Sequence, residues 1–175
     1  DKVKLAGVIC LTLGVILGIA GSANRTQLVS DSGGAEIHVG IWGTRSKVGS
    51  ATVVVSNECD QADIPGSDCA DKNNSKCKTN KAFIIIGILA NVGALVLLAV
   101  GIGPAIVPPV LAGLAGFSYL IVWAIYAGQI NAEAKDCGFK DSTFELGGAF
   151  GCTIVAWLLC WAGAAAAFMS GKSEG

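Results

Sequence analysis

Three long stretches of the chain contain no charged residue, and polar segments separate them. They cover residues 5–24, 82–132 and 146–171. A helix needs about 20 apolar residues to cross a hydrocarbon layer of roughly 30 Å. The middle stretch is long enough for two helices, and the prolines between Gly103 and Pro109 divide it, because proline ends helices. The pattern therefore predicts one membrane domain, residues 1–175, with spans at about 5–23, 82–103, 110–130 and 146–169.

The composition supports a membrane protein. Of the 175 residues, 53% are hydrophobic and 14% are charged, whereas a soluble domain has about 25% charged residues. The net charge of −1 excludes the usual kind of nucleic-acid binder, which needs a basic patch for phosphates. The expected partners are the lipid bilayer and other membrane proteins, in a homo-oligomer or a larger complex, and not nucleic acid.

Four spans place both termini on one side of the membrane. Lys2, Lys4 and Lys172 flank the outermost spans, and the positive-inside rule then favours cytoplasmic termini. We expect a plasma membrane location, with an organelle membrane as the alternative. A cleaved secretory signal is the alternative interpretation of the first apolar stretch, because two lysines precede it and small residues follow it.

The first outer loop, residues 24–81, predicts a small β-sheet. Residues 35–42 partly alternate polar and apolar side chains, and residues 50–55 are rich in β-branched side chains. We expect residues 43–49 to connect these strands as a hairpin turn and residues 27–30 to add a short edge strand. The loop contains seven basic and seven acidic residues, so it is electrically balanced.

Four of the seven cysteines lie in the two outer loops, 24–81 and 131–145. Disulfides persist in oxidising compartments, and four cysteines allow three pairings. We favour Cys59 with Cys69, which closes a short loop, and Cys77 with Cys137, which ties the two loops together. The alternative is four free thiols in a reducing space.

Small residues recur at helical spacing in two of the predicted spans. Gly14 and Gly18 lie four residues apart in the first span, and Gly147 and Gly151 do so in the fourth. Small residues allow helix backbones to approach each other closely, and polar side chains can bond between helices. We therefore expect these glycines and Asn91, in the second span, to be helix-packing residues.

Two Asn-x-Ser/Thr sequences are candidate glycosylation sites. They begin at Asn24, close to the membrane, and at Asn73, farther along the first loop. Asn73 is the better candidate, because Asn24 lies almost at the membrane surface.

The residues that would carry catalysis or metal binding are scarce. His38 is the single histidine, so a four-ligand metal site cannot be assembled around histidines. The loop cysteines do not have Cys-x-x-Cys spacing, and the predicted spans contain no ionisable Asp, Glu, Lys, Arg or His that would indicate transport. We expect no catalytic residue, no metal site and no cofactor, and hence no enzymatic activity.

Gly40-Ile41-Trp42, followed by Cys59 and Cys69, resembles the Gly-Leu-Trp…Cys…Cys signature of the claudin and peripheral myelin protein superfamily. The resemblance extends to the four spans, the long first outer loop and the short final one. It implies an all-α membrane four-helix bundle with a small antiparallel β-sheet in the first outer loop.

The chain also resembles the amastin family, whose members look similar to claudins. Val39, Trp42, Gly43 and Arg45 fit the amastin pattern of an aromatic residue and glycine followed by a basic residue. Fungal four-span cortical proteins are similar in architecture. These resemblances imply a role in lateral assembly, adhesion or membrane organisation.

We therefore expect a non-enzymatic four-span membrane protein that acts through a disulfide-stabilised outer loop. The alternative is a small accessory subunit of a large membrane complex, for example in a bioenergetic membrane. Channel formation is a third hypothesis, and for it the balanced loop charge predicts no ion preference.

Overall fold

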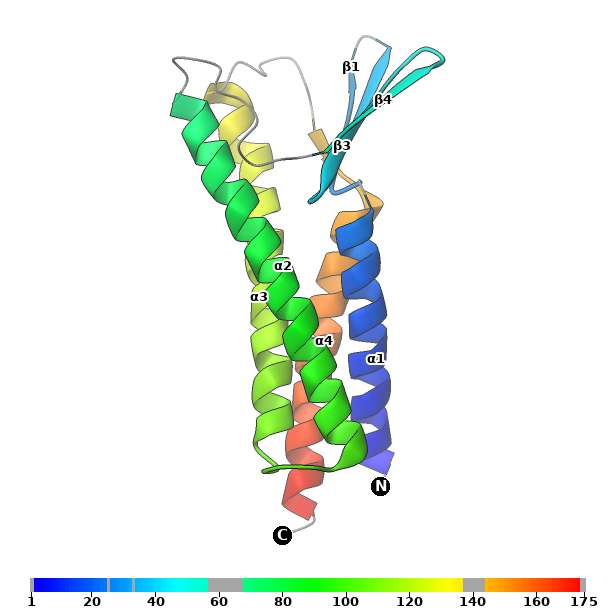
Figure 1. Ribbon diagram of the computed structural model, residues 1–175, viewed down its shortest axis with the longest axis vertical. Helices are drawn as coiled ribbons and strands as arrows, with labels where there is room; N and C mark the ends of the chain where they lie inside the picture. Colours follow the sequence, from blue (N-terminus) through cyan, green and yellow to red (C-terminus); the bar gives the residue numbers. More distant parts are fainter. Residues whose placement is uncertain (1, 25, 33, 57–67, 137–143, 174–175) are drawn as a thin grey trace.

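The computed structural model describes residues 2–24, 26–32, 34–56, 68–136 and 144–173. Four long helices run side by side in the described residues, with both chain termini at one end of the bundle and a sheet at the other (Figure 1). Each helix contains a window long and apolar enough to cross a membrane. The predicted four-helix membrane architecture is confirmed. The helices are α1 (Lys2–Ala23), α2 (Asp68–Val100), α3 (Val107–Asp136) and α4 (Gly148–Ser173).

The sheet has five antiparallel strands, in the spatial order β4-β3-β2-β1-β5. The first outer loop contributes four of them, and the last precedes α4, so the sheet joins both outer loops. The small antiparallel sheet is confirmed, and it is larger than expected. The strands are β1 (Leu28–Ser32), β2 (Ala35–Val39), β3 (Gly43–Val48), β4 (Ala51–Ser56) and β5 (Phe144–Leu146).

Two local predictions within the sheet are wrong. The segment expected to be a hairpin turn, residues 43–49, forms β3 instead, and the turn is reduced to Gly49 and Ser50. Gly49 has φ +59°, the left-handed conformation that tight two-residue hairpins require and that glycine adopts without strain. The segment 27–30, expected at an edge, contributes to β1, which pairs with both β2 and β5.

The connection between α2 and α3 is a tight turn at the terminal end of the bundle. After α2, Gly101 adopts φ +73°, and its N–H donates to the carbonyl of Leu97 at 2.9 Å, which is a common glycine-terminated helix end. Pro108 and Pro109 lie in the first turn of α3, where a missing N–H costs little. The prolines therefore begin the third helix rather than ending the second, and α3 starts before the expected residue 110.

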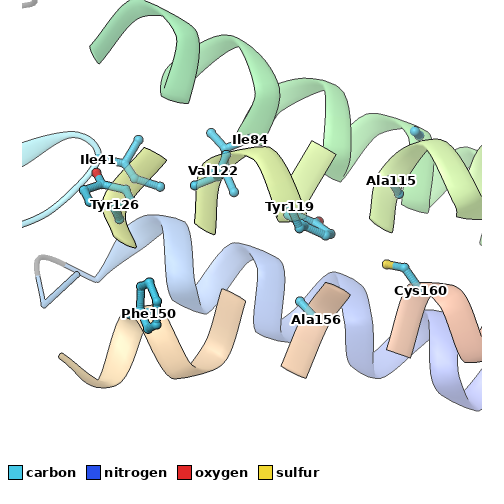
Figure 2. Close-up of a cluster of buried hydrophobic side chains, with 10 residues drawn as sticks. Ile41, Ile84, Ala115, Tyr119, Val122, Tyr126, Phe150, Ala156 and Cys160 are labelled. Atoms are coloured by element: carbon cyan, nitrogen blue, oxygen red, sulfur yellow. The ribbon is translucent and has the colours of Figure 1, made fainter. Parts of the chain in front are cut away.

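Two clusters of buried apolar side chains fill the bundle. The cluster nearer the sheet, which we call the outer cluster, contains Tyr119, Tyr126 and Phe150 among smaller residues (Figure 2). The inner cluster, nearer the termini, is built from Leu11, Leu98 and three alanines: Ala94, Ala112 and Ala167.

Candidate functional site

The loop between β2 and β3 attaches the sheet to the helix bundle. In this loop the N–H of Gly40 donates to the carbonyl of Gly43 at 3.0 Å. The side chain of Ile41 is only 3% exposed and belongs to the outer cluster. Figure 2 shows Ile41 beside Tyr126 at the end of that cluster. Through Ile41, the Gly-Ile-Trp motif thus inserts an apolar side chain from the sheet between the helices.

Trp42, the next residue, has a different environment. Its side chain is 42% exposed, and the ammonium nitrogen of Lys81 lies 5.7 Å from its ring centroid. Lys81 is on α2, so this cation–π contact is a second link between the hairpin and the bundle. Within the motif, Ile41 supplies the buried contact and Trp42 the exposed one.

A hydrogen-bonded joint connects the other side of the sheet to α1 and α4. The side-chain Nε2 of Gln27 donates to the carbonyl of Gly21 at 2.7 Å, and the Gln27 side chain is fully buried. The N–H of Gly147 donates to the carbonyl of Gln27 at 3.0 Å, and the N–H of Ala149 donates to the hydroxyl of Thr26 at 3.2 Å. The sequence pattern did not predict the role of Gln27, and the available signal was a polar side chain three residues after the uncharged stretch that ends at residue 24.

Gly147 has a different role from the expected one. A Cβ built on it collides with the backbone carbonyl of Thr26, so Gly147 permits the joint and precedes α4 rather than packing inside it. Gly151 is exposed, and no atom lies within 4 Å of the position of a Cβ there. The expected helix-packing role of Gly147 and Gly151 is therefore wrong, because the first contacts a loop and the second faces open space.

The other glycine pair, Gly14 and Gly18, does lie at a helix–helix contact. A Cβ on Gly14 meets the amide nitrogen of Asn91 at 3.0 Å and the sulfur of Cys160 at 3.3 Å, and a Cβ on Gly18 collides with the hydroxyl of Tyr119. These two glycines therefore bring α1 close to the other three helices. Asn91 is fully buried there, and its side-chain atoms have no hydrogen-bond partner in the described part of the chain.

The free edge of the sheet is open to the surroundings. In β4, the side chains from Ala51 to Val54 are exposed, and so is Val48 at the end of β3. None of the β4 residues carries a charge. An exposed edge strand of this kind has unpaired N–H and C=O groups that a further strand can pair with.

His38 and Arg45 lie on neighbouring strands of one face, as cross-strand partners. The Nε2 of His38 is 2.7 Å from a carboxylate oxygen of Glu36 in the same strand, so this histidine is engaged within the sheet. Arg45 is exposed, and Gly43 is buried at the start of β3. Among the described residues no group of three His, Cys, Asp or Glu side chains could hold a metal ion.

Several predicted site residues lie outside the residues that the structure describes. Cys59 and Cys137 lie in segments that the structure does not describe, and so do the side chains of Cys69 and Asn73, whose backbones belong to α2. Asn24 is exposed directly after α1, and its glycosylation stays a prediction. The three cysteines of the spans, Cys10, Cys152 and Cys160, are free thiols.

The comparison with known families agrees with this architecture. The family model described as Amastin surface glycoprotein matches residues 8–166, which include all four apolar helices in whole or large part and the sheet between them. No curated protein matches the chain. Amastins are four-span membrane proteins related to claudins, and the chain belongs to the amastin family.

Proposed function

We propose that this amastin organises the membrane by non-enzymatic lateral assembly, with its outer sheet as the contact surface. In this proposal the protein lies in the plasma membrane with both termini in the cytoplasm, and the sheet stands on the outer side. The assembly consists of copies of the chain.

The observation that carries the proposal is a firmly attached sheet with an exposed, uncharged edge. Ile41 is inserted into the outer cluster, and the joint at Gln27 bonds the sheet to α1 and α4. At the opposite side of the sheet, Val53 and Val54 of β4 are exposed on a strand without charge. Exposed β-branched edge strands favour association, and a rigid attachment lowers the entropic cost of ordering them.

We also propose a disulfide between Cys77 and Cys137. Cys77 has an interaction and is not among the free cysteines, which supports a bridge. Cys69 is on the same helix, where eight residues correspond to about 12 Å, too far for a bridge. Cys137 follows Asp136, the last residue of α3, which packs along α2 (Figure 1). The bridge would join the two outer loops and leave Cys59 to pair with Cys69.

Native electrophoresis in mild detergent tests the assembly. The wild-type chain should give a ladder of homo-oligomers, and introducing charge on the free edge with Val53→Glu/Val54→Glu should collapse it to the monomer. Leu158→Ala, an exposed position on α4, is the control and should keep the ladder. A single high-mass band of fixed size, containing other proteins, would instead support an accessory subunit and would contradict the proposal.

Mass spectrometry of peptides from the non-reduced protein tests the disulfides. We expect a linked pair containing Cys77 and Cys137 and a second containing Cys59 and Cys69. Alkylation of all four thiols in the intact protein would refute both bridges, and linkage of Cys77 to Cys59 would refute the pairing.

A further inference from the structure

One face of the sheet has a basic side and an acidic side. Cross-strand partners lie on the same face, and the register places Lys47 opposite Glu36 and Glu36 opposite Asp31, in one row across β3, β2 and β1. In a neighbouring row, Arg45 of β3 is opposite His38. The strand order therefore fixes both basic side chains on β3, to one side of β2.

The acidic side is formed by β1 and β5. Val29 of β1 is opposite both His38 and Glu145, so Glu145 lies on this same face, beyond β1. Asp31 and Glu145 are both exposed. Neighbouring strands are about 4.8 Å apart, so β3 and β1 are separated by about 10 Å, with β2 between them.

The charges at the two sides have no ion-pair partner among the residues that the structure describes. Arg45, Lys47, Asp31 and Glu145 are exposed, and none of the four forms an ion pair within the residues that the structure describes. The two polar side chains of β2 on this face differ, because Glu36 and His38 contact each other at 2.7 Å. The face thus presents two basic side chains on one side and two acidic side chains on the other, none in an ion pair among the described residues, across a strand whose Glu36 and His38 contact each other.

We infer that this face binds the same face of a second copy of the chain in the same membrane, basic side against acidic side. This inference rests on the proposed function, because it adds a charged contact face to the β4 edge through which copies assemble. The strands rise obliquely from the bundle along its long axis (Figure 1), so the faces of the sheet look sideways, toward neighbours in the bilayer.

Symmetry makes the arrangement self-complementary. Two copies in one bilayer that form a closed dimer are related by a two-fold axis along the membrane normal. When such an axis passes near β2, β3 of each copy opposes β1 and β5 of the other. Arg45 and Lys47 then meet Asp31 and Glu145 twice, whereas a neutral lipid surface or a face of one sign would satisfy only half of these charges. Val54, exposed opposite Arg45 on this face, adds apolar contact.

Two charge-reversed variants of the full chain test the inference. R45E/K47E replaces both basic side chains of β3 by acids, and D31K/E145K replaces the acidic side chains of β1 and β5 by bases and leaves Glu36 in contact with His38. Copies with two different epitope tags are co-expressed, extracted in mild detergent, and captured through one tag. Exposed ion pairs are individually weak, but like charges then repel across the whole face. We therefore expect self-capture of each variant to fall at least about fivefold.

Mixing the two variants gives the decisive result. An R45E/K47E copy should capture a D31K/E145K copy as well as wild type captures wild type, which also shows that both variants fold. High salt should weaken the wild-type and mixed pairs alike. Val54→Glu and Val53→Glu form a matched pair, because they add the same charge to neighbouring exposed positions on opposite faces. The first places a carboxylate opposite Glu145 of the other copy and should reduce self-capture at least about threefold, and the second should not.

The outcomes separate the inference from the proposed function. If wild type captures itself and each reversed variant does so equally well, this face is not the contact between copies, while the proposed assembly stands. Failure of the mixed variants to recover capture would also overturn the face. If wild-type copies do not capture one another at all, the proposed assembly itself fails.

Discussion

The outer and inner halves of the bundle pack by different means. The outer half is filled by large rings: Trp123 and Trp157 stack with centroids 6.4 Å apart, and Trp123 lies 6.2 Å from Phe150. The inner half is filled by alanines and glycines that receive Leu11 and Leu98. In Figure 1, α2 and α3 diverge from α1 and α4 toward the sheet. Large side chains keep the helices apart where the sheet inserts Ile41, and small ones bring them together at the terminal end.

The attachment of the sheet depends on the outer half of the bundle and the close contact of the helices on the inner half, so these two properties are separable. Steric changes at the outer joint should detach the sheet, whereas changes at inner glycines should loosen helices and leave the sheet in place. Substitutions in the two halves, and at Asn91 between them, test this division.

Gly147→Ala should have the largest effect, a loss of about 4 kcal/mol of stability. Its Cβ collides with the backbone carbonyl of Thr26, which cannot rotate away as a side chain could. Thermal unfolding in detergent and limited proteolysis of the sheet measure the effect. Gly148→Ala is the matched control, because no atom lies within 4 Å of a Cβ there, and it should change stability by less than about 0.5 kcal/mol. Equal effects of the two variants would contradict the joint.

Ile41→Ala should cost about 3 kcal/mol, because it removes a buried side chain from the outer cluster. Trp42→Ala, its neighbour, should cost about 1 kcal/mol, since it loses an exposed cation–π contact. Protease cleavage within β1–β4, measured against cleavage at the termini, reports detachment of the sheet. A larger effect of Trp42→Ala than of Ile41→Ala would show that Trp42 provides the main attachment.

The sequence could predict the helices and the existence of the sheet, because lipid imposes a long uncharged stretch on each span and β-branched residues mark strands. It could not place β3, because a segment with glycines at both ends and alternating Thr, Arg, Ser and Lys has the composition of a turn as well as of an exposed strand. The segment is a strand because it pairs with β2 on one side and with β4 on the other.

The sequence pattern also could not predict which of the glycines lie between helices. Gly14 and Gly18 have the same four-residue spacing as Gly147 and Gly151, yet the first pair contacts Asn91, Cys160 and Tyr119 and the second does not lie between helices. Spacing shows that two residues share a helix face, and only the tertiary structure shows what that face meets. The Gly-Ile-Trp motif was recognisable, but the burial of Ile41 depends on the space that the aromatic rings create.

Gly163→Ala probes the inner half and should cost about 2 kcal/mol. A Cβ on Gly163 lies 2.6 Å from a methyl carbon of Leu11, a side chain that can partly move aside. Adding Leu11→Ala removes that carbon, so the double variant should cost less than the sum of the two single changes. Gly113→Ala, where no atom lies within 4 Å, is the neutral control. Increased proteolysis of the sheet in Gly163→Ala would contradict the independence of the two halves.

Asn91→Leu should have the smallest effect, under about 1 kcal/mol in either direction. Asn91 lies in the middle of the bundle near the hydroxyl of Tyr119, but the amide atoms and that hydroxyl lack hydrogen-bond partners of acceptable geometry among the described residues. Replacing an unsatisfied amide by an apolar group of similar size removes no bond and lowers the cost of burial. Asn91→Leu/Tyr119→Phe should equal the sum of the single changes, since uncoupled groups add. A loss above about 2 kcal/mol, or non-additivity, would reveal an Asn91–Tyr119 bond that joins the two halves.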